Sequence, residues 1–218
     1  MTNLILSEEF IMDENVQVLD IVIPAEADVK LPSPELVHYY KDYDERNISI
    51  DYYIDENLFE VTKQIMEYNR KDKGIPVEKR KPINIYIMSY GGDLYQAYAC
   101  IATMLASKTP IRTINMGVAM SAGILLLLAG HERYAMKYST AMIHQGSGGA
   151  QGTFSEMEEQ QKNYRKLIDC MRDYILDRTN IDMKLYNKNK TKDWFLTDKE
   201  QVELGIVSKI VDDIDTIL

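Results

Sequence analysis

The sequence predicts an α/β fold with a largely parallel sheet, and two observations carry this prediction. From Arg46 onward, short runs rich in β-branched residues alternate with longer runs of helical periodicity, and strands that alternate with helices pair in parallel. The chain has 218 residues, 45% hydrophobic and 27% charged, which is the composition of one ordinary globular domain. A domain of this size buries a sizeable core without disulfides or metal ions.

The elements are expected in a regular order. Residues 1–45 are polar, acidic and interrupted by prolines, so they are predicted to form an irregular N-terminal arm, followed by a folded domain over 46–218. In that domain the expected elements are a strand at 47–54, a helix at 56–69, a charged loop at 71–82, a strand at 83–88, a helix at 94–107 and a strand at 110–116. Asp93 is placed to cap the helix that follows it. In the 56–69 helix, the side chains expected near one face are Leu58, Phe59, Ile65 and Met66.

Composition also limits the cellular locations and the binding partners that the sequence allows. The net charge of −9 opposes nucleic-acid binding, which needs a basic surface. The uncharged run from Met116 to Gly130 has about 15 residues, fewer than the roughly 20 that cross a bilayer, so no membrane partner is expected. The N-terminus lacks the basic start of a signal peptide, and Cys100 and Cys170 have no metal-ligand spacing. A reduced, cytoplasmic protein is therefore expected.

One hydroxyl lies in an otherwise apolar run. The stretch "GVAMSAGILLLLAG" (117–130) is predicted to form a buried helix with Ser121 near its start. Small neighbours allow a sharp turn that exposes the serine hydroxyl, and the helix N-terminus directs free N–H groups at the same place. Most serines among small residues only serve packing or capping, so this run by itself leaves a nucleophile and a packing residue both open.

Three further features are open to the same two interpretations. The pair Gly91-Gly92 directly follows a predicted strand, where glycine permits close approach of a ligand or simply a turn. His144 ends a short apolar strand, in the right kind of place for a general base, whereas His38 and His131 lie in polar settings typical of the surface. Asp193 precedes Trp194-Phe195, and burial of this aromatic pair would hold its carboxylate firmly. A structural histidine and a capping or solvated aspartate are the more common roles.

The order of these features resembles the ClpP family, the proteolytic subunits of ATP-dependent proteases. The resemblance rests on four stretches: "SYGGDLYQA", "GVAMSAGILLLLAG", "TAMIHQGSGGAQG" and "DWFLTDKEQVELGIV". It extends from about Arg46 to the end of the printed sequence. The departures from the family pattern are Tyr90 and Gly146 where the family has proline, and Thr191-Lys192 where it has an acidic-basic pair. These departures leave the mode of ATPase docking and the ring stoichiometry open.

The resemblance implies a ClpP/crotonase-like fold of stacked ββα units and a Ser121–His144–Asp193 triad that hydrolyses peptide bonds of unfolded proteins. It also implies an oxyanion hole formed by the backbone N–H groups of Gly92 and Ala122. No cofactor is expected in this chain, because ATP would be used by a partner unfoldase of the AAA+ type.

The stretch 153–180 is predicted to be a long helix, with a capping-box signature at Thr153 or Ser155. Apolar residues recur in it at helical spacing: Met157, Tyr164, Ile168, Met171 and Ile175. The resemblance implies that this is a protruding handle helix through which copies of the chain assemble, in the family as a double heptameric ring. On an isolated chain the same stripe would be core.

Other functions remain open on the sequence. A phage-type head-maturation protease shares the fold and the nucleophile motif, and a catalytically silent ring subunit would retain the assembly surfaces. An acyl-CoA enzyme of the wider crotonase fold would not need Ser121, His144 and Asp193 together. The fold alone does not separate these alternatives, because function depends on the site.

Overall fold

The computed structural model describes residues 32–218. The described residues divide into two units, 32–39 and 40–218. Helix α1 (Pro34–Glu45) begins in the first unit and ends in the second. An irregular arm was predicted over 1–45, and this is wrong for 34–45, whose acidic and aromatic residues are helical; the predicted arm over 1–31 lies outside the described residues.

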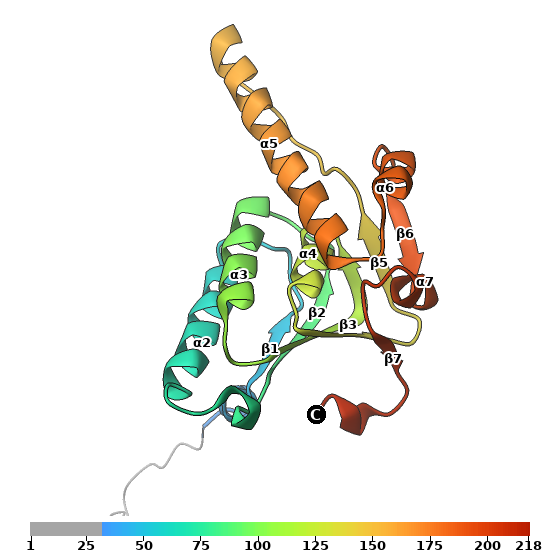
Figure 1. Ribbon diagram of the computed structural model, residues 1–218. Coiled ribbons are helices and arrows are strands. Elements are labelled where there is room, and N and C mark those ends of the chain that lie inside the picture. The colour runs from blue at the N-terminus through green and yellow to red at the C-terminus, as the bar shows by residue number, and fades with distance from the viewer. Residues whose placement is uncertain (1–31) are drawn as a thin grey trace, which may run out of the picture. The chain divides into compact units, whose positions relative to one another are not determined.

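Seven strands form one sheet in the order β1-β2-β3-β4-β7, with β5 and β6 attached beside β3 (Figure 1). The strands are β1 (Asn47–Ile50), β2 (Ile83–Ser89), β3 (Ile111–Met120), β4 (Glu132–Met136), β5 (Thr140–Ile143), β6 (Trp194–Thr197) and β7 (Lys209–Val211). All pairs are parallel except β5 with β6, which is antiparallel. The predicted α/β class with a largely parallel sheet is confirmed.

Helices cover one face of this sheet and enclose the main core (Figure 1). After α1, the helices of the described residues are α2 (Leu58–Lys71), α3 (Leu94–Ala106), α4 (Ala122–Leu128), α5 (Phe154–Arg178), α6 (Met183–Asn189) and α7 (Asp198–Glu203), and there are 3₁₀ turns at Val77–Lys79 and Ile214–Thr216. In β2, Ile83, Ile85 and Ile87 are fully buried on the helix side, as the two-residue period of a strand requires. Residues of the intervening positions face the other side, where a small cluster around Ile114 lies under the chain's last residues.

Three local predictions need correction. The first strand ends at Ile50 rather than 54, and the run 117–130 is not one helix, because β3 continues to Met120 and α4 covers only Ala122–Leu128. In α2, the buried face consists of Leu58, Val61, Thr62, Ile65 and Tyr68, whereas Phe59 and Met66 are exposed. A prediction that counts only strongly apolar residues misses amphipathic side chains such as Thr62 and Tyr68, which are buried in the core.

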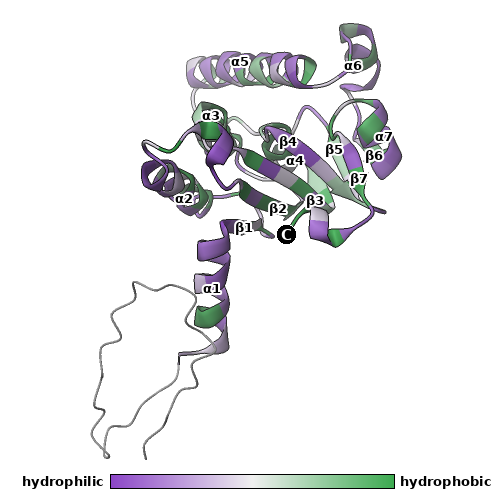
Figure 2. Ribbon diagram, turned by 60° about the horizontal axis from the view of Figure 1, so that its bottom comes forward, coloured by the Kyte–Doolittle hydropathy of each residue, from purple (hydrophilic) through white to green (hydrophobic). Residues whose placement is uncertain are grey.

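Predicted caps are confirmed at two helix starts. Asp93 Oδ1 accepts a hydrogen bond from the N–H of Gln96 at 2.9 Å. Thr153 and Glu156 form a reciprocal capping box at the start of α5. Helix α5 extends beyond the sheet, and its surface is mostly hydrophilic (Figures 1 and 2). Only Met171 and Ile175 in this helix are buried.

Candidate active site

Ser121 lies at a sharp reversal between β3 and α4. Its φ of 53° and ψ of −121° form a conformation that non-glycine residues adopt rarely and that is typical of a strained nucleophile turn. The N–H of Ser121 donates to the carbonyl of Met142 at 3.0 Å, which ties the turn to β5. Ser121 itself is half-buried, whereas every residue of α4 behind it is buried.

His144 approaches Ser121 from the neighbouring strand. Strand β5 pairs in parallel with the end of β3, Met120 opposite Met142, so the residue that follows β5 comes close to the β3–α4 turn. His144 Nε2 lies 2.8 Å from Ser121 Oγ, within hydrogen-bond distance. The histidine side chain is 23% exposed.

Asp193 directly precedes the third strand of this group. Strand β6 runs antiparallel to β5 with Ile143 opposite Trp194, which places Asp193 beside His144 at the same end of the strand pair. Its Oδ1 lies 3.4 Å from His144 Nδ1, and its side chain is 60% exposed. Burial of the aromatic pair was expected to hold this carboxylate, but Phe195 is 55% exposed, so that expectation is wrong for Phe195.

The glycine pair lies against the serine turn. A Cβ on Gly91 (φ +104°) would come within 2.6 Å of Ser121 Cβ, and one on Gly92 (φ +151°) within 2.1 Å of the Ile54 carbonyl oxygen. Only glycine fits such close approaches. Ile54 holds the backbone on both sides of Gly92. Its N–H donates to the Gly91 carbonyl at 2.8 Å, and its own carbonyl accepts from the N–H of Asp93 at 2.7 Å.

The N–H groups of Gly92 and Ala122, which line the same cleft as Ser121, are among those without a backbone partner in the described chain. Ala122 is the first residue of α4, where N–H groups have no intrahelical acceptor. Sequence reasoning missed Ser89, whose buried hydroxyl accepts from the N–H of Gly91 at 3.2 Å and donates to the Tyr52 carbonyl at 2.6 Å. Its only signal in the sequence is its position at the end of a strand before two glycines.

A cleft of about 650 Å³ opens over these groups. Its lining includes Ser121, His144, Gly92 and the tyrosines Tyr53 and Tyr90, which are mostly exposed. The carboxylates Asp55, Glu56 and Asp93 are its acidic members, and it has no lysine or arginine. The charged side chains that line the cleft are therefore acidic.

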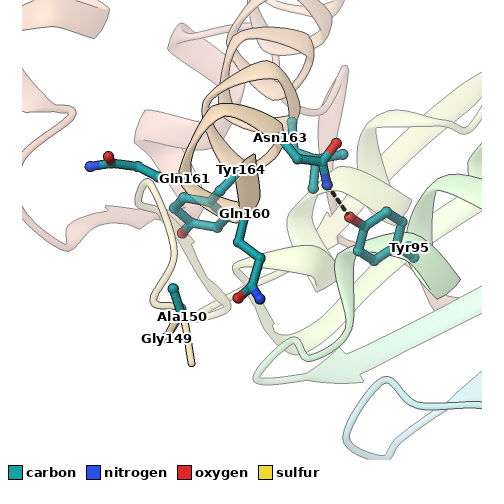
Figure 3. A pocket seen from close by; sticks show the side chains of 9 residues that line it. Tyr95, Gly149, Ala150, Gln160, Gln161, Asn163 and Tyr164 are labelled. Atoms are coloured by element: carbon teal, nitrogen blue, oxygen red, sulfur yellow. Dashed lines mark hydrogen bonds between the residues drawn. The ribbon is translucent and has the colours of Figure 1, made fainter. Parts of the chain in front are cut away.

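The glycine-rich segment that follows His144 is held by the handle helix. Tyr164 of α5 donates its hydroxyl to the Gln145 carbonyl at 3.0 Å, and its ring lies against Gly148. A second cavity of about 430 Å³ lies beside this contact, and Asn163 donates there to the Tyr95 hydroxyl at 2.7 Å (Figure 3). Helices α3 and α5 therefore meet along one edge of the candidate site.

The described residues contain no group of three or more His, Cys, Asp or Glu that could hold a metal ion. Over the same residues, no helix is long and apolar enough to cross a bilayer.

Comparison with known proteins shows to which family the chain belongs. The Clp protease family model matches residues 36–213. Over 132 residues the chain is 35% identical to a protein of Deinococcus radiodurans named ATP-dependent Clp protease proteolytic subunit. That alignment covers 60% of this chain and 65% of the relative, which is slightly less than two thirds of the relative's length. Because the family model covers most of the chain, and the fold agrees with it, the chain belongs to the Clp protease family.

Proposed function

We propose that this chain is a serine endopeptidase that hydrolyses peptide bonds of unfolded polypeptides, with Ser121 as nucleophile, His144 as general base and Asp193 as the group that orients the imidazole. The observation that carries the proposal is the 2.8 Å contact between Ser121 Oγ and His144 Nε2, with Asp193 on the other side of the ring. Membership of the Clp protease family supports the same chemistry.

The reaction follows from these contacts. With the proton on Nδ1 directed at Asp193, His144 Nε2 accepts the Ser121 proton as Oγ attacks the peptide carbonyl carbon. The imidazolium then gives this proton to the leaving amine, the C–N bond breaks, and an acyl-enzyme remains. Water, activated by the same imidazole, hydrolyses the ester and restores the Ser121 hydroxyl. General-base catalysis of this kind contributes about 10²- to 10⁴-fold.

The N–H groups of Gly92 and Ala122 are proposed to hold the oxyanion. Ala122 directly follows Ser121, Gly92 lines the same cleft, and neither N–H group has a backbone acceptor among the described residues. The positive end of the α4 dipole adds to the field at this point. Each preorganised donor of this type contributes about 10²- to 10³-fold.

The peptidase is proposed to act within an oligomer of this chain, a double heptameric ring in the resemblance, fed by an ATP-dependent AAA+ unfoldase. The name of the Deinococcus relative, an ATP-dependent protease subunit, supports the ATP-dependent partner. Helix α5 supports assembly, since Phe154 is 72% exposed at its start and Met157 and Tyr164 are also exposed. A cytoplasmic location, no cofactor in this chain, and no nucleic-acid or membrane partner belong to the same proposal.

A second candidate is a catalytically silent ring subunit, whose triad stays at rest in the assembly formed by this chain alone. One observation favours it: the His144–Asp193 contact is 3.4 Å long, and the carboxylate is largely open to water. Such a geometry weakens the hydrogen bond that would orient the imidazole.

Fluorophosphonate labelling, followed by intact mass measurement, tests the proposal. Assembled wild-type protein and Ser121→Ala would be compared at equal concentration. We expect one adduct on the wild type and none on the variant. A wild-type protein that assembles but takes up no adduct would contradict the peptidase proposal and favour the resting subunit.

A further inference from the structure

The sheet divides inside β3. On one edge, residues Arg112–Asn115 of β3 pair with β4, and residues Val118–Met120 pair with β5. One branch continues from β4 to β7, and the other from β5 to β6. The second branch carries the proposed base and its orienting carboxylate, so the angle at which it leaves β3 decides where these two groups lie relative to Ser121.

Two fully buried amide side chains lie at this division. Asn115 and Gln201 both have 0% exposed surface. Asn115 Nδ2 donates to Gln201 Oε1 at 3.0 Å and to the Thr140 carbonyl at 3.2 Å, and Asn115 Oδ1 accepts from the N–H of Gly117 at 3.1 Å. Gln201 Nε2 donates to the Ser139 carbonyl at 3.2 Å.

The pair thus joins the three parts that meet at the division. Asn115 belongs to β3. Thr140 is the first residue of β5, and Ser139 directly precedes it. Gln201 belongs to α7, which follows β6 directly. The backbone carbonyl of Gln201 also accepts from Ile206 and Val207 at 2.9 and 3.2 Å, which anchors α7 to the chain leading into β7.

Buried amides set positions more strictly than apolar side chains do. An unpaired buried amide destabilises the fold, so each must keep its partners, whereas apolar groups of similar size repack in several arrangements. A shift of β5 along β3 would remove the Thr140 carbonyl from Asn115 Nδ2. The pair therefore favours one register and one angle at the division.

From these contacts we infer that Asn115 and Gln201 are positioning residues of the proposed peptidase site, acting through β5 and β6 on His144 and Asp193. His144 lies four residues beyond Thr140, about 13 Å along the strand, so a tilt of about 5° moves the imidazole by about 1 Å. A misplacement of about 1 Å can cost a catalytic group about 10²-fold in rate. This inference rests on the proposed function.

The test is the double variant N115L/Q201M, which replaces the amide pair with apolar groups of similar length. For fluorophosphonate labelling of the full chain, we expect the maximal rate of inactivation to fall about 10- to 100-fold, and the inhibitor concentration for half-maximal rate to stay within about threefold. Thermal melting should show a folded protein, since an apolar pair can replace a buried polar pair. If the double variant does not fold, Gln201→Met alone is tested instead. We expect the same fall in the maximal rate of inactivation and the same nearly unchanged inhibitor concentration for half-maximal rate.

The matched control is Asn84→Leu. Asn84 is also a buried asparagine of the sheet, and its Nδ2 donates to Asn47 Oδ1 at 3.1 Å, but it joins β1 to β2. We expect its labelling rate to stay within about threefold of wild type. The swapped pair N115Q/Q201N keeps the amides and should label at least about threefold faster than N115L/Q201M.

Two results would overturn the inference: N115L/Q201M labelling at the wild-type rate, or N84L losing rate in the same proportion as N115L/Q201M. Either would leave the labelled wild type, and so the proposed function, intact. A wild-type protein that is not labelled would instead contradict the proposed function, and this inference would fail with it.

Discussion

The two sides of the candidate site are built in different ways. On the serine side, Ser121 lies between a buried helix and the glycine pair, and Leu125 to Leu128 behind it are 0–1% exposed. On the other side, His144 and Asp193 follow and precede short strands, with side chains 23% and 60% exposed. The nucleophile is held by packing, whereas the base and its carboxylate are held by strand register and a few hydrogen bonds.

This difference indicates which side is adjustable. Close packing resists small displacements, because any shift creates a void or a clash. A strand pair that is open to water on one side shifts at lower cost, and local openings concentrate in such regions. An assembly partner that changes the site would therefore act on β5, β6 and the glycine-rich segment, while the serine turn stays in place.

The largest effect is expected on the packed side, from Gly92→Ala. The added Cβ would lie 2.1 Å from the Ile54 carbonyl oxygen, so the backbone must move and its N–H leaves the proposed oxyanion position. Loss of one donor costs about 10²- to 10³-fold, and we expect a fall of about 10³-fold in the fluorophosphonate labelling rate.

Gly117→Ala is the control for this change, since a Cβ there has no atom within 4 Å. It should label at close to the wild-type rate. If Gly92→Ala labelled as fast as Gly117→Ala, the packed side would not contribute the oxyanion donor.

On the open side, Asp193→Asn should lower the labelling rate about 10²- to 10³-fold, because the amide no longer stabilises the charged imidazole. The effect is expected to be smaller than for Gly92→Ala, since water reaches this carboxylate. Labelling kinetics measure it. Asp182→Asn, at the start of α6, should leave the rate unchanged, because asparagine caps a helix as well as aspartate does; equal rates for both variants would remove Asp193 from the mechanism.

Stability should show the same contrast. Leu126→Ala leaves a cavity behind the serine turn, and we expect a loss of about 3–5 kcal/mol in the free energy of unfolding. Phe195→Ala on the open side should change it by less than about 0.5 kcal/mol, since this ring is 55% exposed. Urea denaturation of both variants measures these values. Similar losses for both would mean that the open side is as firmly packed as the serine side.

The pH dependence of stability should arise away from the site, at Asp72. Its hydrogen bonds with the Arg46 guanidinium, with a further one from the Thr109 hydroxyl, hold the pKa of Asp72 below its ordinary value. A lowered carboxylate pKa stabilises the fold above the unfolded-state pKa, and this stability is lost as pH falls through the folded-state pKa.

Asp72→Asn should therefore lower the free energy of unfolding by about 3 kcal/mol at pH 7. The difference in this free energy between variant and wild type should shrink below about pH 4. Urea denaturation between pH 7 and pH 3 measures it. The same substitution at the exposed Asp212 is the control for the change of an aspartate to asparagine. A difference for Asp72→Asn that stayed constant with pH would mean that its charge does not matter.

Some elements could be predicted because their signals are local. The apolar, β-branched run "INIYIM" and the caps at Asp93 and Thr153 depend on residues within a few positions of each other, and the structure agrees with all three. The length of β3 could not be predicted this way. Its last residues look helical in the sequence, yet they pair with β2 and β5, strands distant along the chain.

The residues of the candidate site also fall into two groups, those that short motifs predict and those that only the fold reveals. Ser121, His144 and Asp193 were named from short motifs and their resemblance to one family, and the structure brings the first two to 2.8 Å. Ser89, Ile54 and the Asn115–Gln201 pair carry no motif. Their roles depend on which backbone groups lie beside them, and a single sequence does not contain that information.

By itself, the sequence determined the α/β class, most strand and helix positions, the candidate triad and the resemblance to a protease family, because each depends on local periodicity or on short motifs. Only the tertiary structure decided where β3 divides the sheet, which N–H groups are free beside Ser121, and how open Asp193 is to water. The physical reason is that strand register, burial and buried hydrogen bonds arise between segments far apart in the chain, where each side chain's surroundings come from other elements.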